Sequence, residues 1–86
     1  MNGRVVCHRT TQRRPARRGH PALEAGSLLY LIQYPDGSFF RNGYVLQSSA
    51  KKVMANLTGD DQERAFNSTR DPEHVLQTWT DPTNIY

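Results

Sequence analysis

The chain has 86 residues, 36% of them hydrophobic, with one cysteine and a formal net charge of +3 at pH 7. A chain of this length forms one domain and buries only about 60–65% of the surface that its unfolded form exposes, so its core is small. Because Cys7 is the single cysteine, an internal disulfide framework is excluded. The first residues contain no apolar run, which predicts neither a secretory signal nor a transmembrane span and therefore a cytoplasmic protein with no membrane partner.

Charge divides the sequence near residues 25–27. Residues 1–27 contain six arginines and one glutamate, a net charge of +5, whereas residues 28–86 contain five basic and seven acidic residues, a net charge of −2. Between residues 10 and 26 Leu23 is the one large aliphatic side chain, so little burial is available to offset the entropy of ordering this stretch. We therefore predict a basic, disordered N-terminal tail over residues 1–27, with at most a short strand at residues 4–8, and a folded domain over residues 28–86.

The arginines of this tail are suited to phosphate, because guanidinium groups bind phosphate oxygens in a bidentate way and stay charged. One hypothesis is therefore nucleic-acid binding, in which the tail follows phosphates and two lysines of the domain extend the contact. The residues of this hypothesis are Arg9, Arg13, Arg14, Arg17, Arg18, Lys51 and Lys52. A solvated tail without function, and an extension translated from an upstream start codon, are the alternatives.

Two turn sequences divide the most hydrophobic segment into three predicted strands. Residues 28–34 form an aliphatic and aromatic run, and Pro35-Asp36-Gly37 is typical of a three-residue hairpin loop closed by a left-handed glycine. Residues 38–41 return, and Asn42-Gly43 is the strongest two-residue hairpin sequence. Residues 44–47 then form the third strand of an antiparallel meander.

The register implied by these turns, with Tyr34 opposite Ser38 and Arg41 opposite Tyr44, makes both faces of the sheet apolar. One face carries Leu28, Tyr30, Ile32, Phe40 and Val45. The other carries Leu29, Leu31, Phe39 and Leu46, together with Arg41 and Tyr44.

One main helix is predicted after the sheet. Ser48-Ser49 is typical of a helix N-cap, and the apolar stripe Ala50, Val53, Met54 and Leu57 follows at helical spacing. Thr58-Gly59 is expected to end the helix, which covers one face of the sheet.

Two shorter elements are predicted towards the C-terminus. Asp60 with Glu63 forms a variant capping box for a short helix, and Phe66 lies either on that helix or on a fourth edge strand. Asp71-Pro72-Glu73 predicts the start of a last helix, on which Val75, Leu76 and Trp79 share a face. Residues 81–86 are expected to form a loose arm.

The predicted fold class is α+β: a three-stranded antiparallel β-meander packed on one main helix, with one or two short C-terminal helices. The second face of the sheet then remains as an apolar surface, which favours a protein partner or a homodimer. The predicted partner-binding residues are Leu29, Leu31, Phe39, Arg41, Tyr44 and Leu46. The alternative is that the segment from Phe66 to Trp79 folds over this face and closes it.

No catalytic or metal-ligating pattern is present in the sequence. His8, His20 and His74 are scattered, and no paired-cysteine or paired-histidine spacing typical of a metal site occurs. Asp60, Asp61 and Glu63 are explained by helix capping. We therefore expect a protein that is not an enzyme and that has no cofactor and no metal.

The order of a hydrophobic strand, a glycine turn, "SFFRNGYVL" and then "SSAKKVMANL", over residues 28–67, resembles short accessory proteins of bacteriophages and other mobile elements. Many of these proteins bind and block a host protein. The resemblance implies a protein that acts by occupying a surface of its partner, such as an inhibitor of a host defence system of the anti-CRISPR kind. The partner would be a protein or a nucleoprotein complex. The basic net charge differs from the acidic members of this group that mimic DNA, which disfavours such mimicry.

Overall fold

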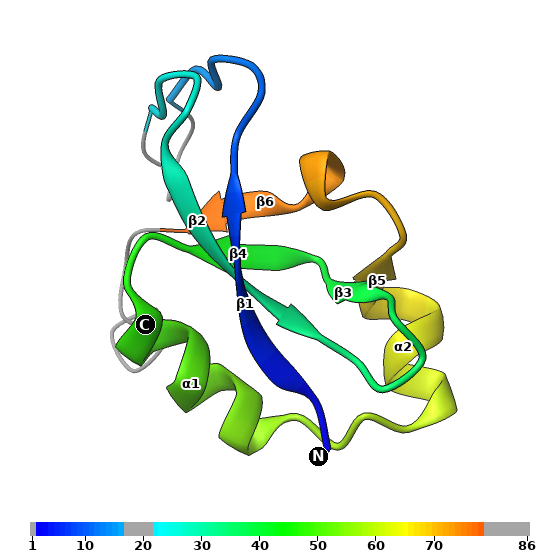
Figure 1. Cartoon of the computed structure of the whole chain (residues 1–86). Helices are drawn as coiled ribbons and strands as arrows, with labels where there is room; N and C mark the ends of the chain where they lie inside the picture. The colour runs from blue at the N-terminus through cyan, green and yellow to red at the C-terminus, as the bar shows by residue number, and fades with distance from the viewer. Residues whose placement is uncertain (1, 17–21, 79–86) are drawn as a thin grey trace.

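A computed structural model describes residues 2–16 and 22–78 (Figure 1). The fold is α+β, with one mainly antiparallel sheet and two α-helices in the described residues. The strands are β1 (Arg4–Arg9), β2 (Leu28–Gln33), β3 (Phe39–Phe40), β4 (Asn42–Tyr44), β5 (Ser68–Thr69) and β6 (Leu76–Thr78). The helices are α1 (Gln47–Asn56), α2 (Asp61–Asn67) and the short 3-10 helix η1 (Pro72–His74).

The N-terminal residues contribute a full strand to the sheet, which corrects the predicted tail for the described part of residues 1–27. β1 pairs antiparallel with β2 over all six residues, from Arg4 opposite Gln33 to Arg9 opposite Leu28. After β1 the chain forms a further bridge between Arg14 and Leu23 before it enters β2. The short strand predicted at residues 4–8 is present and extends to Arg9, and the disordered tail is wrong there because Val5 and Val6 pack against the two cores of the sheet. The ordering entropy is offset by contacts with a distant segment.

The first predicted turn is confirmed. The Tyr34 N–H donates to the Ser38 carbonyl oxygen at 2.8 Å, and Gly37 adopts a φ of 92°. The Asp36 carboxylate accepts the backbone N–H of Ser38 at 3.0 Å, which fixes the loop locally. This hairpin sets the start of β3 opposite the end of β2.

The second predicted turn is wrong, and so is the meander built on it. Asn42 and Gly43 lie inside β4, which continues the direction of β3 after an interruption at Arg41. β3 and β4 both pair with β2, and Tyr30 lies opposite Tyr44. A Cβ atom on Gly43 would approach Leu31 Cδ2 to 2.7 Å and Leu29 Cδ2 to 2.8 Å. This glycine is therefore required by a close approach to buried side chains, and not by a turn.

We expect Gly43→Ala to lower the free energy of unfolding by about 1–3 kcal/mol, because the added methyl group overpacks against two fully buried leucines. Adding Leu29→Val should recover part of the loss, since the smaller side chain makes room. The control is Gly37→Ala, where no atom lies within 4 Å and the left-handed φ alone should cost about 1 kcal/mol. Urea denaturation measures all three, and a Gly43→Ala protein as stable as wild type would contradict the close approach.

α1 packs on one face of the sheet as the sequence predicts. Its apolar stripe contacts a core made of Ile32, Tyr34, Phe40, Tyr44 and Ala50. The predicted serine cap is wrong, because the helix begins at Gln47 and Leu46 occupies the cap position without a side-chain hydrogen bond. Helix formation here is therefore supported by burial of the stripe more than by capping.

The structure places Phe66 on α2 and not on a fourth strand. The Asp60 side chain caps the helix by accepting the backbone N–H of Glu63 at 2.8 Å. The Glu63 carboxylate in turn accepts the N–H groups of Thr58 and Gly59, each at 2.9 Å. The predicted capping box is thus present in a shifted form.

The last predicted helix is instead a single 3-10 turn followed by a strand. Asp71 caps η1 through the N–H of Glu73, but the chain becomes extended at Val75. The Leu76 N–H then donates to the Arg41 carbonyl oxygen at 2.8 Å, and β6 runs parallel to β4. As a strand, residues 76–78 pair their backbone groups with the edge of β4, whereas the groups at the ends of so short a helix would stay without partners. Trp79 and the predicted arm at 81–86 lie outside the described residues.

The second face of the sheet is closed by residues from both sides of the sequence. Leu29, Leu31 and Val75 form a fully buried cluster, with Leu23, Phe39 and Val45 packed against it. The alternative of a closing C-terminal segment is therefore partly realised by Val75, and the segment that contains Leu23 contributes the rest. In the described residues, no helix is long and apolar enough to cross a membrane.

Candidate functional site

The predicted partner-binding residues do not form one surface. Leu29 and Leu31 are fully buried under Val75, and Tyr44 is buried in the core beneath α1. Tyr44 and Val45 have also exchanged faces relative to the prediction, because the expected turn at Asn42-Gly43 does not form. Three residues retain surface area: Phe39 partly, and Arg41 and Leu46 largely.

The residues of the nucleic-acid hypothesis are also separated. Arg9 donates to the Gly26 carbonyl oxygen at 2.7 Å, and Arg13 pairs with Glu24 at 3.2 Å. Lys51 and Lys52 are exposed on α1, which lies at the other end of the molecule from the β1–β2 connection (Figure 1). Arg17 and Arg18 lie outside the described residues. Arg14 differs from all of these, because its side chain is largely buried.

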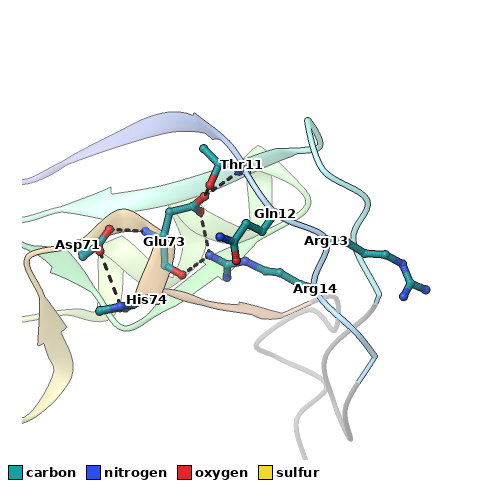
Figure 2. A pocket seen from close by; sticks show the side chains of 7 residues that line it. All are labelled: Thr11, Gln12, Arg13, Arg14, Asp71, Glu73 and His74. Carbon is teal, nitrogen blue, oxygen red and sulfur yellow. Dashed lines mark hydrogen bonds and ion pairs between the residues drawn. The ribbon is translucent and has the colours of Figure 1, made fainter.

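Arg14 lies at a cleft of about 430 Å³ between the segment that follows β1 and the segment around η1 (Figure 2). Figure 2 shows Arg14 reaching across towards Glu73, while Arg13 points away. The cleft is lined by Thr11, Gln12, Arg13, Arg14, Asp71, Glu73 and His74. These residues come from positions about 60 apart in the sequence and meet here because Thr11 and Arg14 both bond to Glu73 of η1.

Glu73 is the centre of the cleft's interactions. Its Oε1 accepts the backbone N–H of Thr11 at 2.7 Å and also the Thr11 hydroxyl. Its Oε2 lies 2.9 Å from His8 Nε2 and 3.2 Å from Arg14 Nη2. The hydrogen bond from the Thr11 hydroxyl, helped by those from His8, the Thr11 N–H and Arg14 against a cost of burial, lowers the pKa of Glu73 to about 2.

Arg14 adds a second tie between the same two segments. Its guanidinium donates to the backbone carbonyl oxygens of Glu73 and Val75 as well as to the Glu73 carboxylate. These contacts hold Val75 over Leu29 and Leu31. The Arg14–Glu73 cluster, defined as His8, Thr11, Arg14 and Glu73, therefore closes the second face of the sheet.

The chemistry of this cluster is that of a structural ion pair and not of a catalytic base. Both oxygens of Glu73 already accept two contacts each, and with a pKa of about 2 the carboxylate does not take up a proton near neutral pH. The Thr11 hydroxyl also donates to this carboxylate. Among the described residues, no group of three or more acidic, histidine or cysteine side chains is arranged to hold a metal ion.

Sequence reasoning missed this cluster. The sequence predicts Arg14 in a phosphate-binding tail and Glu73 at the start of a helix, and the two are 59 residues apart. The Asp71 cap that positions Glu73 was predictable, but its partners on β1 and beyond depend on how the chain folds back.

A different part of the surface carries the most exposed large apolar side chain among the described residues. Phe66 on α2 has 78% of its surface exposed and lines a shallow hollow of about 320 Å³ together with Thr58, Asp60, Gln62, Glu63 and Asn67. The backbone of Arg41 adjoins the end of α2, because its N–H donates to the Asn67 carbonyl oxygen at 2.8 Å, and Arg41 is exposed. We call this the α2 surface, made of Phe66, Arg41 and the hollow.

Comparison of the chain with protein-family models, with curated proteins and with solved structures found no match.

Proposed function

We propose that this protein is a small, non-enzymatic binding protein that occupies a surface of a partner protein through its α2 surface. The observation that carries the proposal is the exposure of Phe66, which is turned away from both cores on a helix that contributes no buried residue. Aromatic residues and arginines are the residue types in which the centres of protein interfaces are enriched, and both Phe66 and Arg41 are exposed.

The α2 surface replaces the sheet face as the candidate interface and keeps one of its residues. Arg41 is predicted for the interface and is exposed, whereas Leu29 and Leu31 of the sheet face are buried in the chain's own core. The resemblance of residues 28–67 to phage accessory proteins suggests, from element order, that the partner is a host protein and that binding inhibits it. A phage-type inhibitor of a host defence system is the form of the proposal that this resemblance favours.

Deleting residues 1–27 is not a suitable test of the proposal against nucleic-acid binding. The deletion would remove β1 and with it the whole β1–β2 ladder, together with Thr11 and Arg14 of the Arg14–Glu73 cluster. Loss of folding would then abolish every activity at once. Substitutions on the surface separate the two hypotheses without this difficulty.

We expect Phe66→Ala to abolish capture of a protein partner from an extract of the native host, while folding is unchanged because alanine favours the helix. Removing a central interface aromatic typically weakens binding about 30-fold or more. The matched control is Leu28→Ala, an exposed apolar residue at the start of β2, which should leave capture intact. Capture is measured at two salt concentrations, and affinities follow with the purified partner.

Two outcomes would contradict the proposal. One is a Phe66→Ala protein that captures the same partner as the wild type. The other is capture that depends on nucleic acid, is lost after nuclease treatment and falls steeply with salt, which would favour the arginine-based alternative.

A further inference from the structure

The outer edge of β1 is a second candidate binding surface, because no described strand pairs with the backbone groups on that side. β1 pairs only with β2 among the strands that the structure describes, and it runs at the front of the sheet in Figure 1. Six residues make it one of the two longest strands in the part of the chain that the structure describes. A strand edge of this length is a template for another extended chain.

The hydrogen-bond alternation identifies which backbone groups face outward. The Thr10 N–H donates to the Ser27 carbonyl oxygen on the β2 side, at 2.9 Å. Successive residues of an antiparallel strand alternate between bonding to the neighbouring strand and pointing their N–H and C=O groups outward, so the even-numbered residues of β1 bond to β2. The N–H and C=O groups of Val5, Cys7 and Arg9 therefore point away from the sheet.

The continuation of this edge already binds a carboxylate. The N–H of Thr11, the next outward-pointing residue after Arg9, donates to Glu73 Oε1 at 2.7 Å. His8 and Arg14 complete the surroundings of that carboxylate. Glu73 thus shows within the chain itself how an acidic group binds at this edge and pairs with nearby basic side chains.

The charges on β1 favour an acidic occupant over a second copy of the chain. Arg4 and Arg9 are both exposed, one at each end of the strand and on opposite faces of the sheet, and Cys7 is exposed between them. Arg4 donates to Gln33 Oε1 at 2.8 Å and Arg9 to the Gly26 carbonyl oxygen at 2.7 Å, so both charges have neutral partners within the chain. Positive charges on an edge strand disfavour pairing with an identical strand. The same charges attract a strand that carries glutamate or aspartate.

We propose that the outer edge of β1 accepts an extended acidic segment of a partner protein as an added strand. The backbone groups of Val5, Cys7 and Arg9 supply the hydrogen bonds, and Arg4 and Arg9 select for acidic side chains. This inference rests on the proposed function, protein binding, but it uses a surface other than the α2 surface and is testable without the natural partner.

The probe is an eight-residue peptide with two consecutive glutamates at each end and valines between them, so that a glutamate lies on each face of the sheet at both ends, since Arg4 and Arg9 lie on opposite faces. It is compared with peptides in which glutamine or lysine replaces glutamate and with a single-stranded oligonucleotide. We expect the acidic peptide to bind about tenfold more tightly than the glutamine peptide at low salt and to lose this advantage at high salt. Amide hydrogen exchange, followed by NMR, should slow at Val5, Cys7 and Arg9. Val6 and His8 should not change, because their amides already bond to β2.

Variants of Cys7 test the backbone mechanism. Cys7→Pro removes one outward N–H without removing a bond to β2, and should weaken peptide binding about tenfold. Cys7→Ala keeps the N–H and should bind as the wild type does. If Cys7→Pro fails to fold, the double variant that combines Arg4→Glu with Arg9→Glu tests the proposal instead. It should reverse the preference from the glutamate peptide to the lysine peptide.

Four results would overturn the inference: no binding of the acidic peptide, equal binding of the glutamine peptide, protection produced by the oligonucleotide instead, or a dimer formed through β1 without peptide. Each leaves the effect of Phe66→Ala on partner capture unchanged. Conversely, peptide binding that persists in Phe66→Ala, together with unchanged partner capture, would support the β1 edge and reject the α2 surface.

Discussion

Replacing Leu31 by alanine is expected to lower the free energy of unfolding by about 3–5 kcal/mol, because the side chain is fully buried and a cavity would remain between Val75 and the sheet. For a domain of this size such a loss is a large part of the total stability. Urea denaturation at neutral pH, followed by circular dichroism, measures it. A stable Leu31→Ala protein that has lost only partner binding would show that this face of the sheet is an interface after all.

The matched control is Leu46→Ala, the same substitution at a leucine that is 57% exposed. It should cost less than about 1 kcal/mol, since few contacts are lost. Both leucines were predicted to bind a partner, so the pair separates a core position from a surface position by a single measurement. Equal effects at the two positions would contradict the burial that the structure assigns to Leu31.

Replacing Glu73 by glutamine is expected to lower the free energy of unfolding by about 1.5–3 kcal/mol at pH 7. The amide removes the charge that pairs with Arg14 and places an N–H₂ group against donors of Thr11 or Arg14. The lower part of this range allows for solvent screening, because the Glu73 side chain is 27% exposed. Glu24→Gln is the control, since it makes the same change in an exposed ion pair with Arg13 and should cost about 0.5 kcal/mol or less.

The pH dependence gives this prediction a second measurement. The pKa of Glu73 is about 2 in the folded protein and near 4.5 when the chain is unfolded, so the unfolded state binds the proton more readily. The stabilisation is therefore fully present above about pH 4.5 and is lost as the pH falls towards 2. The difference in stability between wild type and Glu73→Gln should shrink over this range. A difference that stays constant from pH 7 to pH 2.5 would mean that the carboxylate charge does not stabilise the fold.

Local patterns in the sequence were sufficient for the elements whose contacts lie close along the chain. The Pro35-Asp36-Gly37 turn, the apolar stripe of α1 and the Asp60 cap of α2 each depend on residues within one or two turns of one another. The wrong predictions, the Asn42-Gly43 turn and the last helix, depend instead on contacts between segments far apart in the sequence. Asn42-Gly43 has a turn sequence, but its glycine is needed where two leucines of β2 approach the backbone.

The α+β class, the apolar character of both sheet faces and the covering of one of them by α1 were determined by the sequence itself, because side-chain alternation and helical periodicity are local properties. Which segment closes the other face was decided only by the tertiary structure. That face is covered because Arg14 and Glu73, 59 residues apart, hold Val75 in place, and no local pattern encodes a pairing over that distance. The candidate interface at Phe66, in place of the sheet face, also follows only from the tertiary structure, because α2 leaves Phe66 on the outside of both cores.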